Sequence, residues 1–257
     1  MDQPIIIIGM GELGGVFARG FLRIGYPVYP VTREMNILEA LKSYPEPLCV
    51  LVAVAENDLL DVLSTVPIQW QKKLCLLQNE LLPRTWQEYN VDDPTVISVW
   101  FEKKKGKGCK VLLPSPVFGP NAALFADALD RLDIPRKILS SENELLFELV
   151  LKNVFVFTIN IAGLETGGTV HTLWTEHNRL ARRIADEIID LQERLTGSEF
   201  SRKRLIDGFV AAIDGDPDHK CTGRAAPERL SRVVKIARDA DLDLPGIMEI
   251  HKRLNIL

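Results

Sequence analysis

The chain opens with an apolar segment that runs directly into a cluster of glycines. Four consecutive isoleucines at residues 5–8 are followed by Gly9-Met10-Gly11-Glu12-Leu13-Gly14. A strand, a G-x-G-x-x-G turn and a helix in this order are the fingerprint of a dinucleotide-binding βαβ unit. The glycines permit a tight turn, a close approach of backbone amides to a diphosphate, and close packing of the helix on the strand. The motif therefore predicts an α/β fold for this part of the chain.

The segments around the motif support this interpretation. An amphipathic stretch at residues 16–22 follows the glycines, Gly25 interrupts it, and a second apolar strand is predicted at residues 28–31. A purely structural βαβ turn is the alternative, because glycine tolerates many backbone angles. We predict that all six residues of the turn contact a dinucleotide, whose negative charge would lie at the positive end of the helix.

The end of the second predicted strand bears on the choice of cofactor. NAD-binding units usually carry Asp or Glu there, whereas this chain has Thr32 and Arg33. A guanidinium offers a planar fork of donors to phosphate oxygens, so NADP, with its 2′-phosphate, is favoured. In the alternative, Glu34 binds the ribose of NAD and Arg33 is only a solvated charge. Val54, at the end of the third predicted strand, is a further candidate cofactor contact.

Two residues conflict with their local patterns. Glu12 places an acid inside a phosphate-binding turn, where it would repel the ligand unless its side chain points away. Pro30 lies inside a predicted strand although it has no N–H to donate, which indicates a bulge or a strand end.

Short apolar runs alternate with helical segments up to about residue 138. This alternation predicts a mostly parallel sheet covered by helices. The further strands are predicted at residues 48–54, 74–77, 96–100 and 111–113, and the helices at residues 36–43, 57–64 and 121–132. Gly106 marks a hairpin near the far edge of the sheet.

From Ser141 onward the sequence shows only helical patterns, and Ser141 with Glu144 forms a capping box at the first of them. The helices are predicted at residues 143–164, 172–195, 201–213, 227–240 and 246–254. We therefore predict a Rossmann-type α/β domain at residues 1–140, followed by an all-α domain at residues 141–257.

Composition excludes several classes of function. The net charge of −4 gives no general attraction to nucleic acid or to an anionic membrane, and the lysines of residues 103–107 are interpreted as a solvated hairpin turn. The four cysteines lack C-x-x-C spacing and the four histidines lack metal-ligand spacing, so neither a disulfide framework nor a metal site is predicted. No secretory signal pattern is seen at the N-terminus, and a cytoplasmic location is expected.

The segment at residues 143–164 is apolar nearly all round, which indicates a buried helix. A membrane span is the alternative, but Glu148, Lys152, Asn153 and Asn160 interrupt the segment. Lys152 either forms an i, i+4 ion pair with Glu148 or presents an ammonium to a ligand carbonyl, with Asn160 further along the same side.

The chain resembles the ketopantoate reductase family of NADPH-dependent 2-oxoacid reductases over most of both domains. The resemblance depends on the glycine motif with Arg33, on Leu77-Gln78-Asn79, where the family has Leu-Gln-Asn-Gly, and on Lys152 with Asn160, which match the family's Lys-x-x-x-Asn-x-x-x-Asn helix. The tail Leu242-Asp243-Leu244-Pro245 before a last helix also looks like the family's ending.

The resemblance implies that a nicotinamide cofactor gives hydride to a ketone carbon while Lys152 assists protonation of the carbonyl oxygen. Asn160 would add a hydrogen bond or orient the substrate, and Asn79 would bridge cofactor and substrate. The resemblance also implies that the all-α domain at residues 141–257 binds the substrate and forms a homodimer. The alternatives are that Asn79 caps a helix at residues 80–86 and that Asn160 is a satisfied buried amide.

The sequence also departs from the family pattern. Val156 replaces the first asparagine of the helix, Glu80 replaces a glycine, and residues 55–57 lack a lysine. The serine and glutamate that bind substrate in the family have no clear match around residues 219–228. We therefore predict an NADP-dependent oxidoreductase that reduces a small 2-oxoacid-like carbonyl or imine in a cleft between the domains. The alternative is a catalytically degenerate nucleotide-binding, sensing or scaffold protein.

Overall fold

The computed structural model describes residues 3–254 of the 257-residue chain. The contacts divide the chain into two compact units, residues 1–149 and 150–257. This division falls inside the long helix α7 (Glu142–Thr166), whereas the predicted boundary at residue 140 precedes that helix.

Unit 1 is built on a seven-stranded sheet with the order β2-β1-β3-β4-β5-β8-β9. The strands β1 to β5 pair in parallel, β8 is antiparallel to β5, and β9 is parallel to β8. The mostly parallel α/β class is confirmed. The strands are β1 (Ile5–Ile8), β2 (Val28–Val31), β3 (Cys49–Val52), β4 (Leu74–Leu76), β5 (Thr95–Ile97), β8 (Ser115–Phe118) and β9 (Arg136–Ile138).

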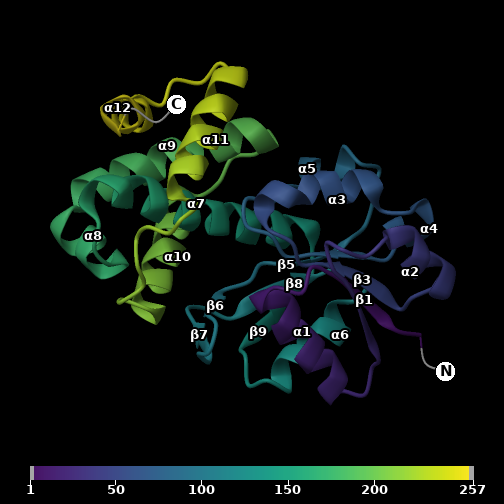
Figure 1. Cartoon of the computed structure of the whole chain (residues 1–257). Coiled ribbons are helices and arrows are strands. Elements are labelled where there is room, and N and C mark those ends of the chain that lie inside the picture. The colour runs from purple at the N-terminus through teal and green to yellow at the C-terminus, as the bar shows by residue number, and fades with distance from the viewer. Residues whose placement is uncertain (1–2, 255–257) are drawn as a thin grey trace. The chain divides into compact units, whose positions relative to one another are not determined.

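Helices cover both faces of this sheet (Figure 1). On one face lie α1 (Glu12–Arg23) and α6 (Ala122–Asp130), which pack against each other. The other face is covered by α2 (Ile37–Ser43), the 3₁₀ turn η1 (Glu56–Asp58), α3 (Leu59–Thr65), α4 (Ile68–Gln71) and α5 (Pro83–Gln87).

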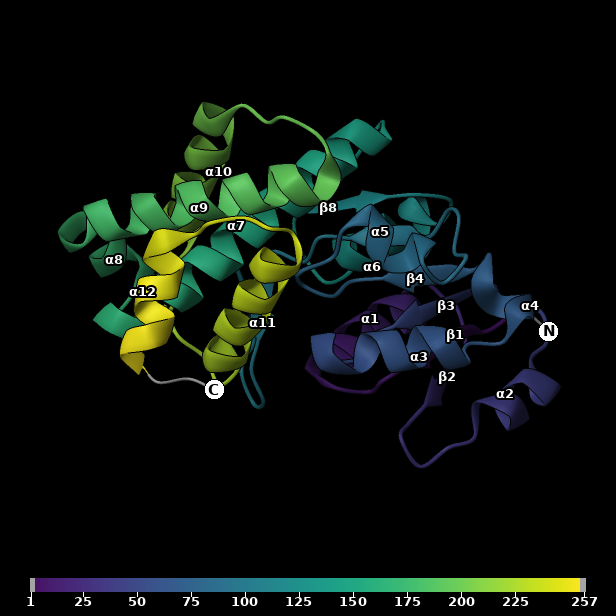
Figure 2. The same ribbon diagram turned by 90° about the horizontal axis from the view of Figure 1, so that it is seen from above.

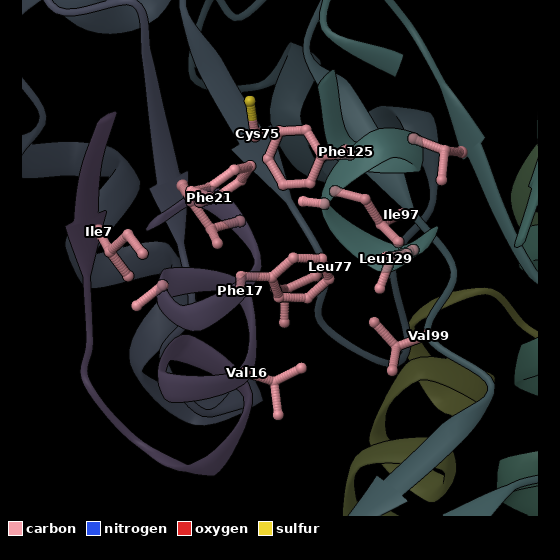
Figure 3. Packing of buried hydrophobic residues seen from close by; sticks show 14 of the residues in the cluster. Ile7, Val16, Phe17, Phe21, Cys75, Leu77, Ile97, Val99, Phe125 and Leu129 are labelled. Carbon is pink, nitrogen blue, oxygen red and sulfur yellow. The ribbon is translucent and has the colours of Figure 1, made fainter. Parts of the chain in front are cut away.

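Alternate residues of each central strand point to opposite faces of the sheet and pack in two separate cores. Ile5 and Ile7 pack in the core that Phe17, Phe21 and Phe125 build under α1 and α6 (Figure 3). Residues 6 and 8 belong to the opposite core, which contains Trp70 and Trp86. Because both faces are buried, the central strands are apolar throughout, as the run of isoleucines predicted.

The sequence prediction was doubtful or incomplete at three places in the sheet. Pro30 lies inside β2, which is tolerated because β2 is an edge strand. The predicted hairpin is confirmed, but β6 (Phe101–Lys103) and β7 (Cys109–Val111) form a separate two-stranded sheet instead of extending the large one. The far edge is formed by β8 and β9, which were not predicted; Pro116 inside β8 weakens its strand signal.

The regular elements of unit 2 are helices, as predicted for this part of the chain. It comprises the C-terminal part of α7, then α8 (Val170–Glu176), α9 (Asn178–Thr196), α10 (Arg202–Gly215), α11 (Ala226–Asp239) and α12 (Pro245–Leu254). Helix α12 packs against α11 and α9 (Figure 2). The buried Glu187 carboxylate of α9 accepts the backbone N–H groups of Gly246 (2.7 Å) and Ile247 (2.9 Å), and so caps α12.

The prediction of one helix over residues 172–195 is wrong, because the chain leaves the helical conformation at His177. The Asn178 side chain donates to the carbonyl of Trp174 at 2.9 Å and satisfies the end of α8. At the start of α7, the Glu144 N–H donates to Ser141 Oγ, as the capping box predicted. The Glu144 carboxylate accepts from the N–H of Ser140, one residue before the capping serine, and this hydrogen bond lowers the pKa of Glu144.

Helix α7 has the length and apolar composition of a membrane span, but 78% of its most apolar stretch is buried inside the protein. It contributes Leu145 and Leu149 to the core of unit 1 and an almost continuous run of buried residues to unit 2. This is the burial pattern of a core helix.

Candidate cofactor and substrate site

The candidate cofactor residues follow the carboxyl ends of neighbouring parallel strands. The register pairs Ile8, the last residue of β1, with Val31 of β2 and with Val52 of β3. The chain continues from β1 to β2 on one side and then to β3 on the other, so the turn after β1 lies at a topological switch point of the sheet. Ligands of open α/β sheets bind in the crevice at such a point.

Close backbone contacts explain two of the glycines in the turn, and a third is open to solvent. Gly9 has φ +96°, and a side chain there would meet the Ala53 carbonyl oxygen at 2.8 Å. A Cβ on Gly14 would collide with the carbonyl oxygen of Gly9. Gly11, by contrast, is exposed and has open space around it, and no side chain caps the helix that begins at Glu12. These residues therefore fit an anion held by the first amides of α1.

Glu12 is paired with a lysine from a distant part of the sequence. Lys103 Nζ lies 3.2 Å from Glu12 Oε2, and the Lys103 side chain is 19% exposed. The expectation of a wholly solvated hairpin thus does not hold for Lys103. Sequence reasoning missed this pair, because 91 residues separate its members and no local pattern links them.

Arg33 is also engaged by an acid. Its side chain is 89% exposed, and Nη2 lies 2.7 Å from Oδ2 of Asp58 in the 3₁₀ turn after β3. Thr32 and Glu34 beside it are exposed. A 2′-phosphate on Arg33 would have to compete with the Asp58 carboxylate. The sequence analysis did not anticipate Asp58 as a neighbour of this position.

Gln78 and Asn79 connect β4 to the end of β3. The Gln78 amide nitrogen donates to the carbonyls of Val52 (2.8 Å) and Val54 (3.3 Å), while Asn79 Nδ2 donates to Glu56 Oε1 at 2.7 Å. The alternative in which Asn79 caps a helix at residues 80–86 is wrong, because α5 begins only at Pro83.

Glu80 occupies an unusual backbone conformation beside these residues. Its φ is +67°, so the left-handed conformation is present at the position where the resembled family has glycine. The other non-glycine residues with positive φ in the described part of the chain are asparagine or aspartate, which tolerate this conformation better. The turn after β4 therefore holds a glutamate in a backbone conformation that is unfavourable for this residue.

The candidate substrate residues lie on one face of α7. Lys152, Val156 and Asn160 are spaced by four residues, which places them above one another along the helix. Lys152 is half-buried and Asn160 is buried. Asn160 Nδ2 donates to the Val156 carbonyl at 2.8 Å, and Asn160 Oδ1 accepts from Arg229 Nη1 at 3.2 Å.

Arg229, in the first turn of α11, was missed by the sequence analysis. Its guanidinium reaches the α7 face although 69 residues separate Arg229 from Asn160. The nearest sequence signal is the adjacent Glu228, in the segment where the resembled family has a substrate-binding glutamate. The structure thus brings a positive side chain next to one of the predicted substrate residues.

Neither metal nor thiolate chemistry is supported by the described residues. Across residues 3–254, no group of three or more metal-ligating side chains is placed to hold an ion. Burial raises the pKa of the Cys75 thiol and raises that of Cys221 to about 11, so both stay protonated at neutral pH. Like Cys49, they are packed as small apolar side chains.

Comparisons with known proteins reveal a similarity of structure. No protein-family profile and no curated protein sequence matches the chain. A 2-dehydropantoate 2-reductase from Methylococcus capsulatus superposes with a TM-score of 0.71 at 12% identity, covering 98% of this chain and 96% of that one. A dimeric ketopantoate reductase from Staphylococcus aureus gives 0.62 at 14% identity, covering 99% and 100%.

A third structure shows that enzymes named for another substrate share this architecture. Glycerol-3-phosphate dehydrogenase from Coxiella burnetii gives a TM-score of 0.57 at 13% identity, covering 98% of this chain and 94% of that one. Fold alone therefore does not fix the substrate. The described part of the chain has the fold of these ketopantoate reductases.

Proposed function

We propose that this protein is an NADP-dependent oxidoreductase that reduces a small 2-oxoacid-like carbonyl or an imine. The observation that carries the proposal is the turn from Gly9 to Gly14, which leaves uncapped helix amides at the switch point of a parallel sheet. The fold shared with 2-dehydropantoate 2-reductases supports it. When bound, the dinucleotide supplies the hydride.

The chain's own residues then have distinct tasks. The amides that follow Gly11 bind the diphosphate, and Thr32 with Arg33 binds the 2′-phosphate. Val54 and Asn79, at the carboxyl ends of β3 and β4, contact the cofactor. NAD, held by Glu34, is the alternative cofactor.

On α7, Lys152 donates a proton to the substrate oxygen. An ammonium next to that oxygen stabilises the negative charge that develops as hydride is added to the carbon. Asn160 holds Arg229, and the guanidinium suits the carboxylate of a 2-oxoacid because it offers paired N–H donors. This arrangement favours an acid over a neutral ketone as substrate.

The direct test is ligand-induced stabilisation followed by turnover. A ligand that binds only the native state raises its stability with the logarithm of ligand concentration. NADPH is expected to raise the melting temperature more than NADH at equal concentration. NADPH consumption should then be detectable with a panel of 2-oxoacids and imines. Absence of stabilisation by either dinucleotide would refute the proposal.

A nucleotide-binding protein without catalysis is the second candidate. It is favoured by Val156 at the position of a family asparagine and by the Asn160 amide, whose oxygen and nitrogen both bond within the protein. This candidate predicts NADP binding without turnover of any carbonyl or imine.

We further propose a homodimer in the cytoplasm. The dimeric ketopantoate reductase of the same fold supports the first part, and four free cysteines are compatible with a reducing compartment. Sedimentation of the purified protein tests the oligomeric state.

A further inference from the structure

We infer that Lys103, from the β6–β7 hairpin, belongs to the dinucleotide site, where it neutralises Glu12 and binds the diphosphate. The inference rests on the proposed function, since it assigns a further residue to the same site. The ligand group concerned is the diphosphate shared by NADP and NAD.

The hairpin is held against α1 by an aromatic contact. Phe101 at the start of β6 lies 6.4 Å from Phe17 of α1, measured between ring centroids. Phe101 and Lys103 are two residues apart on the strand, so their side chains point to the same face. This contact directs Lys103 toward α1, where its ammonium meets the first turn of the helix at Glu12.

The Lys103 ammonium is fixed by two bonds. It donates to Glu12 Oε2 at 3.2 Å and to the carbonyl oxygen of Lys104 at 2.8 Å. An ammonium has three donors, which leaves the third for a phosphate oxygen. The Lys103 side chain is only 19% exposed, so water screens its electrostatic interactions less than those of a fully solvated lysine.

The charge balance of the turn gives Lys103 its role. Without Lys103, the Glu12 carboxylate would lie in the same turn as the dianionic diphosphate, and the two negative groups would repel each other. Paired with Lys103, Glu12 contributes no net charge, and the dipole of α1 again favours the anion. This resolves the conflict that Glu12 presents in the sequence.

The hairpin provides a matched control. Lys104 is adjacent and carries the same charge, but its ammonium pairs with Glu102 inside the hairpin at 2.9 Å. Lys103→Ala and Lys104→Ala therefore change the net charge equally, but only the first removes a contact with α1.

The experiment is calorimetric titration of NADPH into the full-length protein at low ionic strength. Lys103→Ala is expected to weaken binding about tenfold, Lys104→Ala less than twofold, and Glu12→Gln to tighten binding severalfold. In the double variant Glu12→Gln with Lys103→Ala, much of the loss should be recovered, because the uncompensated carboxylate is gone. Lys103→Gln, which keeps the apolar stem, serves if Lys103→Ala unfolds.

Each outcome separates the two proposals. If the parent protein binds NADPH and the two lysine variants bind equally well, the role of Lys103 is overturned while the proposed function stands. Weaker binding by Glu12→Gln would also overturn it, because the carboxylate would then contact the ligand directly. If the parent protein binds neither NADPH nor NADH, both proposals fail.

Discussion

The glycine turn after β1 and the polar face of α7 differ in how they would recognise a ligand. The turn uses backbone groups and open space, with Gly11 exposed and the amides of α1 uncapped. The α7 face uses side chains, and those of Asn160 and Arg229 already bond to each other. Backbone recognition requires only that the chain follow one path, whereas side-chain recognition changes with each substitution.

This contrast explains where the chain departs from the family it resembles. The glycine motif is complete, and Glu80, where the family has glycine, has a left-handed backbone. On α7, Val156 replaces a polar family residue, and Arg229 approaches from α11. The cofactor site is therefore expected to be conventional and the substrate to be unusual.

The glycine turn is tested by adding one methyl group at adjacent positions. In Gly14→Ala the new Cβ meets the Gly9 carbonyl, which should cost about 3 kcal/mol of unfolding free energy and abolish dinucleotide binding. Gly15→Ala is the control, because nothing lies within 4 Å of its Cβ. It should stabilise α1 by roughly 0.5–1 kcal/mol. Urea denaturation measures both, and equal stabilities would refute the close approach.

On the α7 face, Lys152→Ala should lower turnover about 100-fold, the scale of a positioned general acid, and leave NADPH affinity unchanged. Lys203→Ala is the control, because Lys203 lies in α10 with an 84% exposed side chain and pairs with Asp207. Steady-state kinetics on a responsive substrate measures the effect. Turnover that survives Lys152→Ala would remove Lys152 from the mechanism.

The Arg33–Asp58 pair belongs to the candidate cofactor site, but Arg33 would recognise the cofactor through its side chain and not through the backbone. Asp58→Asn removes the competing carboxylate and should tighten NADPH binding about fivefold, within the range of an exposed ion pair. NADH affinity should stay the same, since that cofactor lacks the 2′-phosphate. Titration of both cofactors measures the ratio. An equal change for NADH would instead favour ribose recognition through Glu34.

The smallest effect is expected for the left-handed backbone at Glu80. Glu80→Gly relieves a strained φ of +67° but makes the unfolded chain more flexible, so the two effects nearly cancel. Asp133→Gly, at φ +58°, removes a residue that tolerates this conformation. The first variant should therefore be more stable than the second by about 1 kcal/mol. Thermal unfolding compares them, and the reverse order would show that Glu80 is not strained.

Local sequence patterns were sufficient for the main elements of the fold. The run of isoleucines, the glycine motif and the alternation of apolar and helical segments predicted the parallel sheet, because a strand buried on both faces must be apolar throughout. The break at His177 and the strand at Ser115–Phe118 escaped prediction, because a side-chain cap and a proline act through contacts that periodicity does not record.

The sequence by itself determined the α/β class and the amides available for a dinucleotide, since these follow from residue order within short segments. Only the tertiary structure decided the electrostatic partners: Lys103 with Glu12, Asp58 with Arg33, Glu56 with Asn79 and Arg229 with Asn160. Each pair joins residues between 23 and 91 positions apart. Charges interact through space, and no spacing along the chain reveals which of them the folded backbone brings within hydrogen-bond distance.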